Sequence, residues 1–435
     1  MNWEKLLTYK RLGLNTTVSD GVRTEYYRDY DRVVFSAAFR RLARKTQVHP
    51  LSFNDHIHNR LTHSIEVSCV GRSLGLAISK KIKTNLPSNV SEVDFASIVQ
   101  AACVAHDIGN PPFGHAGEYA IRQWFKENEH LLHQSLTECQ KNDLKLFEGN
   151  AQGFRIVSQL ENHYKSGGLR LTYATLGALI KYPWQSSHNL AKEKDKFNIF
   201  QSEVDIFNDV ANVLGLSKRS DGSYARHPLS YLMEAADDIC YKILDVEDAL
   251  ELNLLRMDDI IGIFEKLAGK KNSDDIGCEF SSRKRIISFR AKAIENLIAE
   301  VVEVFDANYS EIMNGNFEGD LISKIDGDCK CGIDEIKEIT KKNIFSNRRK
   351  IELEVGSYSS IEIILNAFIL AVNDKIDNGD KMTFKSKRIL DLMQDDFPKN
   401  GCTPYEYYMS ITDFVSGMTD NYATFIAKQI SGSAK

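Results

Sequence analysis

The chain has 435 residues, of which 43% are hydrophobic and 26% are charged. These fractions are close to those of average globular proteins, and they exclude a disordered or collagen-like chain. The 55 Lys and Arg residues nearly balance the 60 Asp and Glu residues, so the net charge of −5 does not indicate a nucleic-acid-binding protein.

The N-terminal residues and the cysteines indicate the cellular compartment. The first residues, MNWEKLLTYKRLG, have neither the apolar segment nor the small-residue cleavage site of a secretory signal. Eight cysteines scattered along such a chain are expected to be reduced thiols. We therefore expect a cytoplasmic protein that makes no membrane contact.

The spacing of apolar residues predicts an all-α fold. Only 8 prolines interrupt the chain, and long stretches carry apolar residues at helical spacing rather than in strict alternation. The Asp-Gly and Asn-Gly pairs lie in polar surroundings, not between the alternating runs of a β-hairpin.

Three predicted helices each turn one ionisable side chain onto an otherwise apolar face. Burying a carboxylate without a partner costs several kcal/mol, so an acid on such a face needs a positive group beside it. The helices and their inward side chains are residues 60–78 with His63, residues 93–109 with His106, and residues 228–245 with Asp237.

A divalent cation would satisfy these buried groups together. It would be bound by His63, His106, Asp237 and the adjacent Asp107. Two imidazoles and two carboxylates suit Mg, Mn, Fe, Co, Ni or Zn. Taken singly, each residue is more often a core polar group with an ordinary partner, but together they favour a metal site.

The residues after the His-Asp pair predict a second functional element. Gly109 is expected to end the preceding helix in a left-handed conformation, and Pro111 and Pro112 prevent its continuation. A new helix is expected to begin near His115, with Glu118 on the same face. A carboxylate that holds an imidazole can serve general acid–base catalysis near neutral pH. The alternative is a surface helix whose two polar residues share a face by chance.

Two polar stretches, residues 269–278 and 314–332, are expected to be loops. The first divides the chain into a block of residues 1–268 and a later helical region, 269–435, which is expected to pack on that block. The most apolar run, residues 361–372, is interrupted by polar residues and is expected to be a buried core helix rather than a membrane span.

Six strings of the sequence resemble the deoxyguanosine triphosphate triphosphohydrolase (dGTPase) family of HD-domain phosphohydrolases. The most specific match to this branch is residues 105–118, AHDIGNPPFGHAGE, whereas a lone His-Asp pair would carry little information. The strings are RDYDRVVFSAAFRRLARKTQVHPL (28–51), NRLTHSIEVSCVGR (59–72), AACVAHDIGNPPFGHAGEYAI (101–121), FEGNAQGFRI (147–156), YLMEAADDICYKILDVEDAL (231–250) and DFVSGMTDNYA (413–423).

The resemblance implies an all-α HD-domain core with additional C-terminal helices, and it assigns roles to site residues. The implied metal ligands are those favoured above, and His115 with Glu118 becomes the catalytic pair. The implied substrate-binding residues are Gln47 for the deoxynucleoside, Arg60 and Lys196 for the phosphates, Tyr241 and Asp245 for the sugar, and Asn150, Lys181 and Tyr182 at further pocket positions. Each of these also has an ordinary alternative, such as a core tyrosine or a solvated lysine.

One departure from the family bears on base selectivity. Members specific for dGTP carry an arginine in the C-terminal helix that reaches a neighbouring subunit's site, but residues 405–420 contain no Arg or Lys. A broader dNTP hydrolase is therefore an open alternative. Glu354 lies in a string that would be placed to contact the base. The resemblance also implies a homo-oligomer, a hexamer in particular.

The expected function is metal-dependent hydrolysis of dGTP, or of dNTPs more broadly, to a deoxynucleoside and tripolyphosphate. Mg is the favoured metal, with Mn, Co, Ni or Fe as alternatives. The sequence contains no GxxxxGK[ST] phosphate-binding loop, so the metal centre would have to perform the chemistry. The alternatives are another HD-type nucleotide phosphohydrolase or phosphodiesterase, and a nucleotide-sensing or single-stranded-DNA-binding protein that uses the basic segment 40–45.

Overall fold

The secondary structure is helical throughout the part of the chain that the structure, a computed structural model, describes. That part comprises residues 1–14, 23–47, 57–162, 167–269, 282–345, 347–398 and 401–433. Extended pairing within it is limited to isolated bridges such as Thr46 with Asn59. The predicted all-α fold is therefore confirmed.

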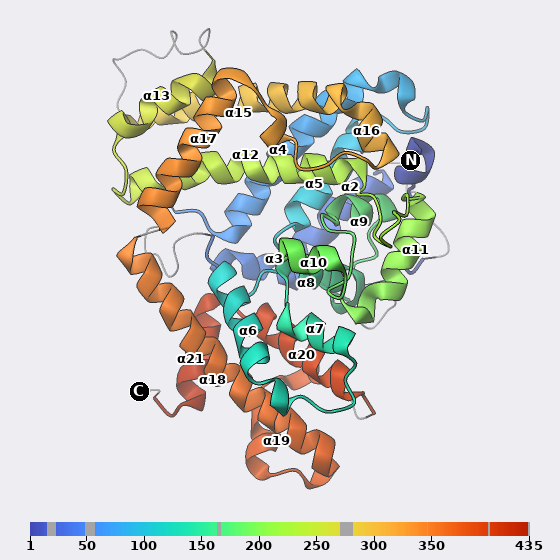
Figure 1. The fold of residues 1–435 in the computed structure, drawn as a ribbon, viewed down its shortest axis with the longest axis vertical. Coiled ribbons are helices and arrows are strands. Elements are labelled where there is room, and N and C mark those ends of the chain that lie inside the picture. The colour runs from blue at the N-terminus through green and yellow to red at the C-terminus, as the bar shows by residue number, and fades with distance from the viewer. Residues whose placement is uncertain are drawn as a thin grey trace.

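The upper lobe of the molecule in Figure 1 surrounds the paired helices α4 and α5. Its helices are α2 (Glu25–Val34), α4 (Arg60–Lys81), α5 (Glu92–Ala105), α9 (Tyr173–Leu179), α12 (Pro228–Glu251), α13 (Met257–Ala268), α15 (Ser282–Ala307) and α17 (Gly327–Thr340). The helices α4, α5 and α12 pack on one another through fully buried residues such as Val67, Phe95 and Ile239. These are the three helices from which the sequence predicts inward His and Asp side chains.

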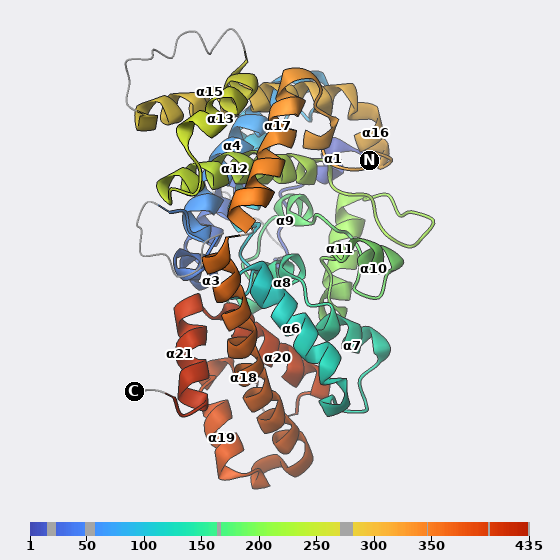
Figure 2. The same ribbon diagram turned by 60° about the vertical axis from the view of Figure 1, so that its left-hand side comes forward.

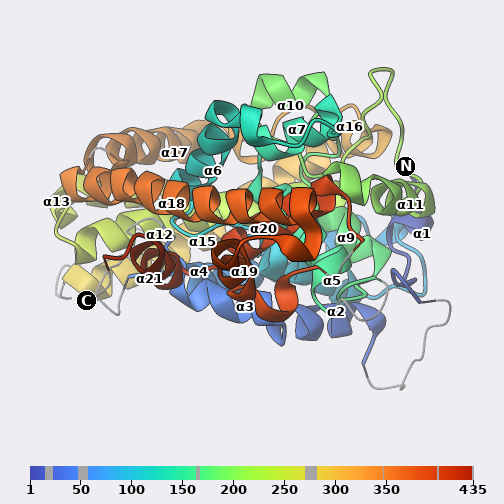
Figure 3. The ribbon, with the colours of Figure 1, turned by 90° about the horizontal axis from the view of Figure 1, so that it is seen from below.

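The lower lobe is arranged along the long helix α18, which runs down to the bottom of the molecule in Figure 2. Its helices are α6 (His115–Glu127), α7 (Glu138–Lys145), α18 (Arg348–Asn378), α19 (Phe384–Asp391), α20 (Pro404–Gly417) and α21 (Asp420–Ile430). Seen from below, α18 crosses the lobe with α20, α21 and α19 around it (Figure 3). Phe125, Phe368 and Tyr408 are fully buried in this second core.

Shorter helices complete the fold. They are α1 (Trp3–Leu6), α3 (Ala37–Arg41), α8 (Gly149–Arg155), α10 (Asn189–Lys194), α11 (Val204–Leu214) and α16 (Tyr309–Asn314). The two hydrophobic cores do not follow the predicted division at residue 268: the first extends from Trp3 to Ile344, and the second from Phe113 to Ala427. The two-block organisation stays a prediction, but each core draws residues from both blocks.

The stretch Lys350–Lys381 is long and apolar enough to cross a membrane by length and composition, the one such stretch among the described residues. Core helices pass the same test, and 44% of its apolar window is buried inside the structure. Ile361, Phe368 and Val372 are fully buried against neighbouring helices. The run 361–372 is thus part of a core helix, as predicted.

The helices that carry the site begin where the sequence predicts, because each has a local start signal. Asn59 caps α4 by accepting hydrogen bonds from two backbone N–H groups, and Ser91 forms a capping box at α5. Pro228 opens α12 at a position where its missing N–H costs nothing.

Two predicted boundaries are wrong, and one lies largely outside the described residues. Residues 314–332 are not one loop, since α17 already begins at Gly327. Helix α5 ends at Ala105, and Gly109 is not among the residues with positive φ, so it does not end the helix in a left-handed conformation. Of the predicted loop 269–278, only Gly269 is described.

Gly109 is instead required by a close approach of two backbones. A Cβ at this position would lie 2.1 Å from the backbone nitrogen of Gly153 and 2.2 Å from the carbonyl oxygen of Gly149. Real Cβ atoms essentially never approach so closely, and backbone atoms of α8 cannot move aside cheaply. The glycine therefore allows α8 to lie directly against the loop that follows Asp107.

We predict that Gly109→Ala lowers the free energy of unfolding by about 3 kcal/mol or more, since an added methyl group must displace the α8 backbone. Gly262→Ala is the matched control, because Gly262 lies within α13 and its Cβ would meet no atom within 4 Å. That control should gain up to about 1 kcal/mol from helix propensity. Urea unfolding of the two variants measures both changes, and equal stability of the two would contradict the packing argument.

Candidate metal centre and active site

A cavity of about 380 Å³ collects most of the residues that the sequence predicts for the site. Its volume is within the range typical of small-molecule sites. The predicted residues on its wall are Gln47, Arg60, His106, Asp107, His115, Glu118, Asn150, Lys181, Tyr182, Lys196, Asp237 and Tyr241. Two predicted residues are not on the wall. His63 lies beside Asp237, and Asp245 lies further along α12.

Asp237 brings two histidines from different helices together. Its Oδ1 lies 3.0 Å from Nε2 of His63 on α4 and 3.4 Å from Nε2 of His106 at the end of α5. One ligand atom from each of the three residues lies within 4.8 Å of the others. Such a separation of imidazole and carboxylate donors is suitable for a single metal ion.

The surroundings of His106 fit a cation as the missing partner. Its Nδ1 lies 2.7 Å from the carbonyl oxygen of Cys103, an acceptor, so Nδ1 carries the hydrogen and Nε2 faces the cluster. Nε2 is buried and has no hydrogen-bond partner among the described residues. Burial lowers the pKa of His106, but the nearby carboxylates of Asp107 and Asp237 raise it to about 9. A bound cation would take the place of the proton that these carboxylates attract.

Asp107 adjoins this cluster with both of its carboxylate oxygens already engaged. Oδ2 accepts a hydrogen bond of 2.6 Å from Arg60, and Oδ1 accepts one from the Asn110 side chain. Oδ1 is also 3.5 Å from Nε2 of His106. Burial opposes ionisation, but Arg60 and the histidines lower the pKa of Asp107. Asp107 is therefore oriented toward the cluster as an anion, and its role as a fourth ligand stays a prediction.

His115 stands at the first position of α6, as predicted, on the wall of the cavity. Two residues with positive φ precede it, Phe113 at 64° and Gly114 at 61°. His115 is exposed, but desolvation by the surrounding protein atoms, together with the positive charges of Arg60 and Lys196, lowers the pKa of His115 to about 4. The imidazole is therefore neutral near pH 7 and able to accept a proton.

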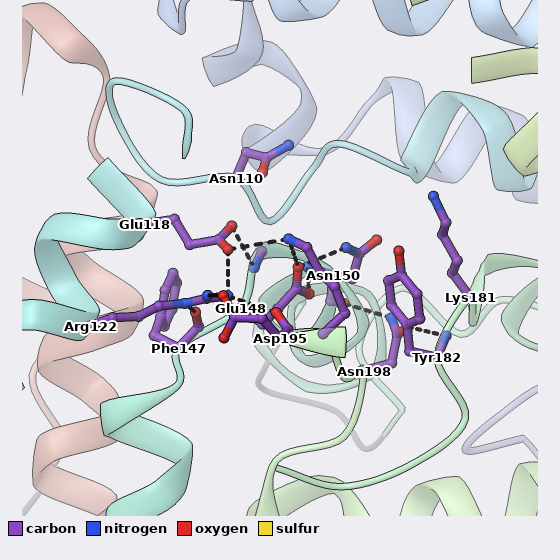
Figure 4. Close-up of polar contacts among 12 residues, drawn as sticks. Asn110, Glu118, Arg122, Phe147, Glu148, Asn150, Lys181, Tyr182, Asp195 and Asn198 are labelled. Atoms are coloured by element: carbon purple, nitrogen blue, oxygen red, sulfur yellow. Dashed lines mark hydrogen bonds and ion pairs between the residues drawn. The ribbon is translucent and has the colours of Figure 1, made fainter. Parts of the chain in front are cut away.

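The expected direct contact between His115 and Glu118 is wrong. Among the described residues, the hydrogen bonds of Glu118 come from Arg122 (2.6 Å), Lys196 (3.3 Å) and the backbone N–H of Gly149 (3.4 Å). The two side chains share the first turn of α6, but cationic neighbours and a backbone N–H hold the carboxylate instead (Figure 4). A catalytic role for Glu118 stays a prediction.

Glu148 is a buried site residue that the sequence reasoning missed. It precedes α8 and accepts hydrogen bonds from Lys196 (2.6 Å) and from both the side chain and the backbone N–H of Asn150 (3.0 and 2.7 Å). Burial and the nearby Glu118 raise the pKa of Glu148. Its position in the matched string FEGNAQ was the available signal.

The positive charge of Lys196 is compensated by two carboxylates of the protein. Its Nζ lies 3.3 Å from the carboxylate of Glu118 and 2.6 Å from that of Glu148. Although burial lowers the pKa of Lys196, Glu148 and Glu118 raise it overall. The predicted phosphate ligand is thus a charged lysine with two acidic partners. Arg122 completes this network by donating to the carbonyl oxygen of Phe147 and to Asp195.

The loop after α9 places two more predicted residues on the wall. Lys181 lies 3.0 Å from Glu234, so it is not a solvated surface lysine. The backbone N–H of Tyr182 donates to the side chain of Asn198, which in turn donates to the carbonyl oxygen of Asn150 (Figure 4). Asn198, a second residue that the sequence reasoning missed, therefore ties this loop to α8.

Two buried oxygen atoms of predicted site residues have no hydrogen-bond partner in the described part of the chain. Oε1 of Gln47 belongs to a residue of the cavity wall, whereas Oδ2 of Asp245 belongs to a residue outside it. Burial raises the pKa of Asp245 well above its ordinary value. Because an unpaired buried acceptor is costly, the Gln47 oxygen is suited to receive a hydrogen bond from a bound ligand.

The helical core and the His-Asp cluster define the class of protein. The consecutive residues His106 and Asp107 at the end of α5 meet His63 of α4 and Asp237 of α12. The HD domain family model matches residues 60–165. The protein is therefore an HD-domain metal-dependent phosphohydrolase.

Relatives extend the similarity to almost the whole chain. The chain is 44% identical to a deoxyguanosinetriphosphate triphosphohydrolase-like protein of Pseudomonas aeruginosa and 37% identical to one of Synechocystis, with 99% of both chains covered in each case. It is 30% identical to a deoxyguanosinetriphosphate triphosphohydrolase of Yersinia pestis, with 91% of both chains covered. The chain therefore belongs to the deoxyguanosinetriphosphate triphosphohydrolase-like family of HD-domain enzymes.

We predict that the affinity for Mn²⁺ rises with pH between about 6 and 9, by up to about tenfold per unit, because binding must displace the proton of His106. Calorimetry of the metal-free protein in buffers of different ionisation enthalpy measures the affinity and the released proton. His106→Ala should abolish binding, whereas His130→Ala, which removes an exposed histidine outside the cavity, should leave it unchanged. An affinity independent of pH would contradict this account.

Proposed function

We propose that this enzyme hydrolyses deoxynucleoside triphosphates at the α-phosphorus and releases the deoxynucleoside and tripolyphosphate. The observation that carries the proposal is a single cavity with the His63–His106–Asp237 cluster and three cationic side chains, Arg60, Lys181 and Lys196, around it. The names of the relatives support a nucleoside triphosphate as the substrate.

The metal would be held by His63, His106 and Asp237, with Asp107 as the fourth ligand. Mg²⁺ is our proposed native metal because the carboxylates and the substrate phosphates are hard oxygen ligands; Mn, Co, Ni and Fe suit the imidazoles. When bound, such a metal supplies Lewis-acid chemistry, since it polarises a phosphoryl group and neutralises its charge.

His115 is the proposed proton carrier. A neutral imidazole on the cavity wall is able to accept a proton from the attacking water and to return one to the departing 5′-oxygen. Arg60 orients Asp107 with one N–H group, while its buried Nε has no hydrogen-bond partner in the described part of the chain. The Nε–H group of Arg60 is our proposed contact to a phosphate oxygen, because phosphoryl transfer depends mainly on positioning and charge stabilisation.

The deoxynucleoside is proposed to lie against Gln47, Tyr241 and Asp245. The unpaired acceptor of Gln47 supports a hydrogen bond from the sugar or base. Tyr241, one turn after Asp237 on α12, is proposed to fill the space that a 2′-hydroxyl would need. Asn150, Lys181, Tyr182 and Lys196 are proposed to line the rest of the substrate site.

Base selectivity is proposed to be broader than dGTP alone. Residues 405–420 lack the cation that the family's dGTP-specific members carry there. Glu354, paired with Lys350, does line the cavity and is a candidate contact to a base.

We also propose a cytoplasmic homo-oligomer, a hexamer as the resemblance implies. The exposed apolar residues Val355 of α18 and Phe425 of α21 support self-association.

We predict that each active dNTP yields tripolyphosphate and deoxynucleoside in equal amounts, measured by anion-exchange chromatography and phosphorus NMR with Mg²⁺ or Mn²⁺ present. Detection of orthophosphate or pyrophosphate alone would contradict the proposal and favour another HD-type phosphohydrolase.

His115→Ala should lower kcat by roughly 10²-fold while the metal affinity is kept, because the side chain moves a proton and holds no metal. The exposed-residue variant His130→Ala should retain full activity.

A further inference from the structure

The short connection between α20 and α21 contacts two segments that form the wall of the active site. We call Ser416 and Asp420, which flank this connection, the C-terminal clamp. It joins residues 45–46, which precede Gln47, to residues 110–113, which precede His115. These three segments are far apart in the sequence, and two of them lie outside the matched HD domain.

Lys45 provides the first connection. Lys45 belongs to the basic segment 40–45 but is only 3% exposed. Its Nζ donates to the carbonyl oxygen of Asn110 and to that of Ser416, each at 2.6 Å. The Nζ of one lysine thus links the loop after Asp107 to the end of α20.

Asp420 provides the second connection through both of its carboxylate oxygens. Oδ2 accepts from the backbone N–H of Thr46 at 3.0 Å and from its hydroxyl at 2.5 Å, and Oδ1 accepts from the backbone N–H of Phe113 at 2.9 Å. Asp420 is only 2% exposed and is the first residue of α21, where the helix dipole favours a negative charge.

The segment that Asp420 holds has an unfavourable backbone conformation. Phe113 has a φ of 64°, which a residue with a large side chain rarely adopts and which costs free energy unless the surroundings impose it. The hydrogen bond from its N–H group to Asp420 is such a constraint. Gly114 and His115 follow directly, so the position of the imidazole depends on this turn.

We propose that Asp420 is a positioning residue for catalysis: with Lys45, it fixes the segment before Gln47 and the turn before His115 relative to each other. It touches neither the metal cluster nor the cavity. The C-terminal helices are thereby required for turnover and not for metal binding. This inference rests on the proposed role of His115.

The test compares Asp420→Ala and Asp420→Asn with Thr419→Ala in the full-length protein. Thr419 caps the same helix by accepting from the backbone N–H of Tyr422, so its loss weakens α21 without touching the two segments. We measure kcat and KM, Mn²⁺ affinity by calorimetry, and hydrogen–deuterium exchange of peptides that cover residues 43–47 and 108–116.

Asp420→Ala is expected to lower kcat at least tenfold, to speed exchange in both peptides, and to leave the Mn²⁺ affinity within about twofold. Asp420→Asn keeps the side-chain shape but only one acceptor, so its effects should be smaller and in the same direction. Thr419→Ala should keep kcat within about twofold. If Asp420→Ala fails to fold, Asp420→Asn decides.

Unchanged exchange in both peptides would overturn the clamp, and faster exchange with unchanged kcat would overturn its positioning role. An equal loss of kcat in Thr419→Ala would show that Asp420 acts only by stabilising α21, and this would overturn the positioning role. If the wild-type protein releases no tripolyphosphate, the proposed function fails, but the exchange measurement still decides whether Asp420 holds the two segments.

Discussion

The carboxylate of Asp237 is the group on which the site depends. It lies in the middle of α12, its side chain is 30% exposed, and it is compensated by two imidazoles, His63 from α4 and His106 from the end of α5. Desolvation opposes its ionisation, but these histidines, His106 above all, hold the pKa of Asp237 well below its ordinary value. The packing of α4, α5 and α12 therefore also sets the geometry of the cluster, because moving any of these helices would separate this partly buried charge from its partners.

Charge compensation also organises the opposite wall, where the lower lobe meets the upper one. Glu118 from α6 and Glu148 from the start of α8 share Lys196, and Arg122 anchors Glu118 from the other side. Pairing these acids with cations leaves none of the charges on this wall without a partner of opposite sign. Acidic, basic and amide side chains thus line much of the cavity, which suits a charged phosphate substrate.

Helical periodicity was sufficient to predict that His63, His106 and Asp237 come together, because each interrupts an apolar face of a helix whose start signal is local. The family resemblance added most of the cavity wall. Neither approach identified Glu148, Asn198 or Asp420, whose partners are distant in the sequence and are set by tertiary packing. The same limit explains the error at Gly109, which serves a backbone contact with α8 rather than a helix cap. The error at Glu118 has a local cause, because Arg122, one turn further along α6, competes with His115 as its helical neighbour.

The most direct test of the central claim is the position of the metal. Crystals of the protein grown with Mn²⁺ and measured near the manganese absorption edge give an anomalous difference map. The account predicts one strong peak in each active site, in contact with Nε2 of His63, Nε2 of His106 and a carboxylate oxygen of Asp237. No peak at this cluster at saturating Mn²⁺, or a peak bound elsewhere in the cavity by Glu118 and Glu148, would contradict it.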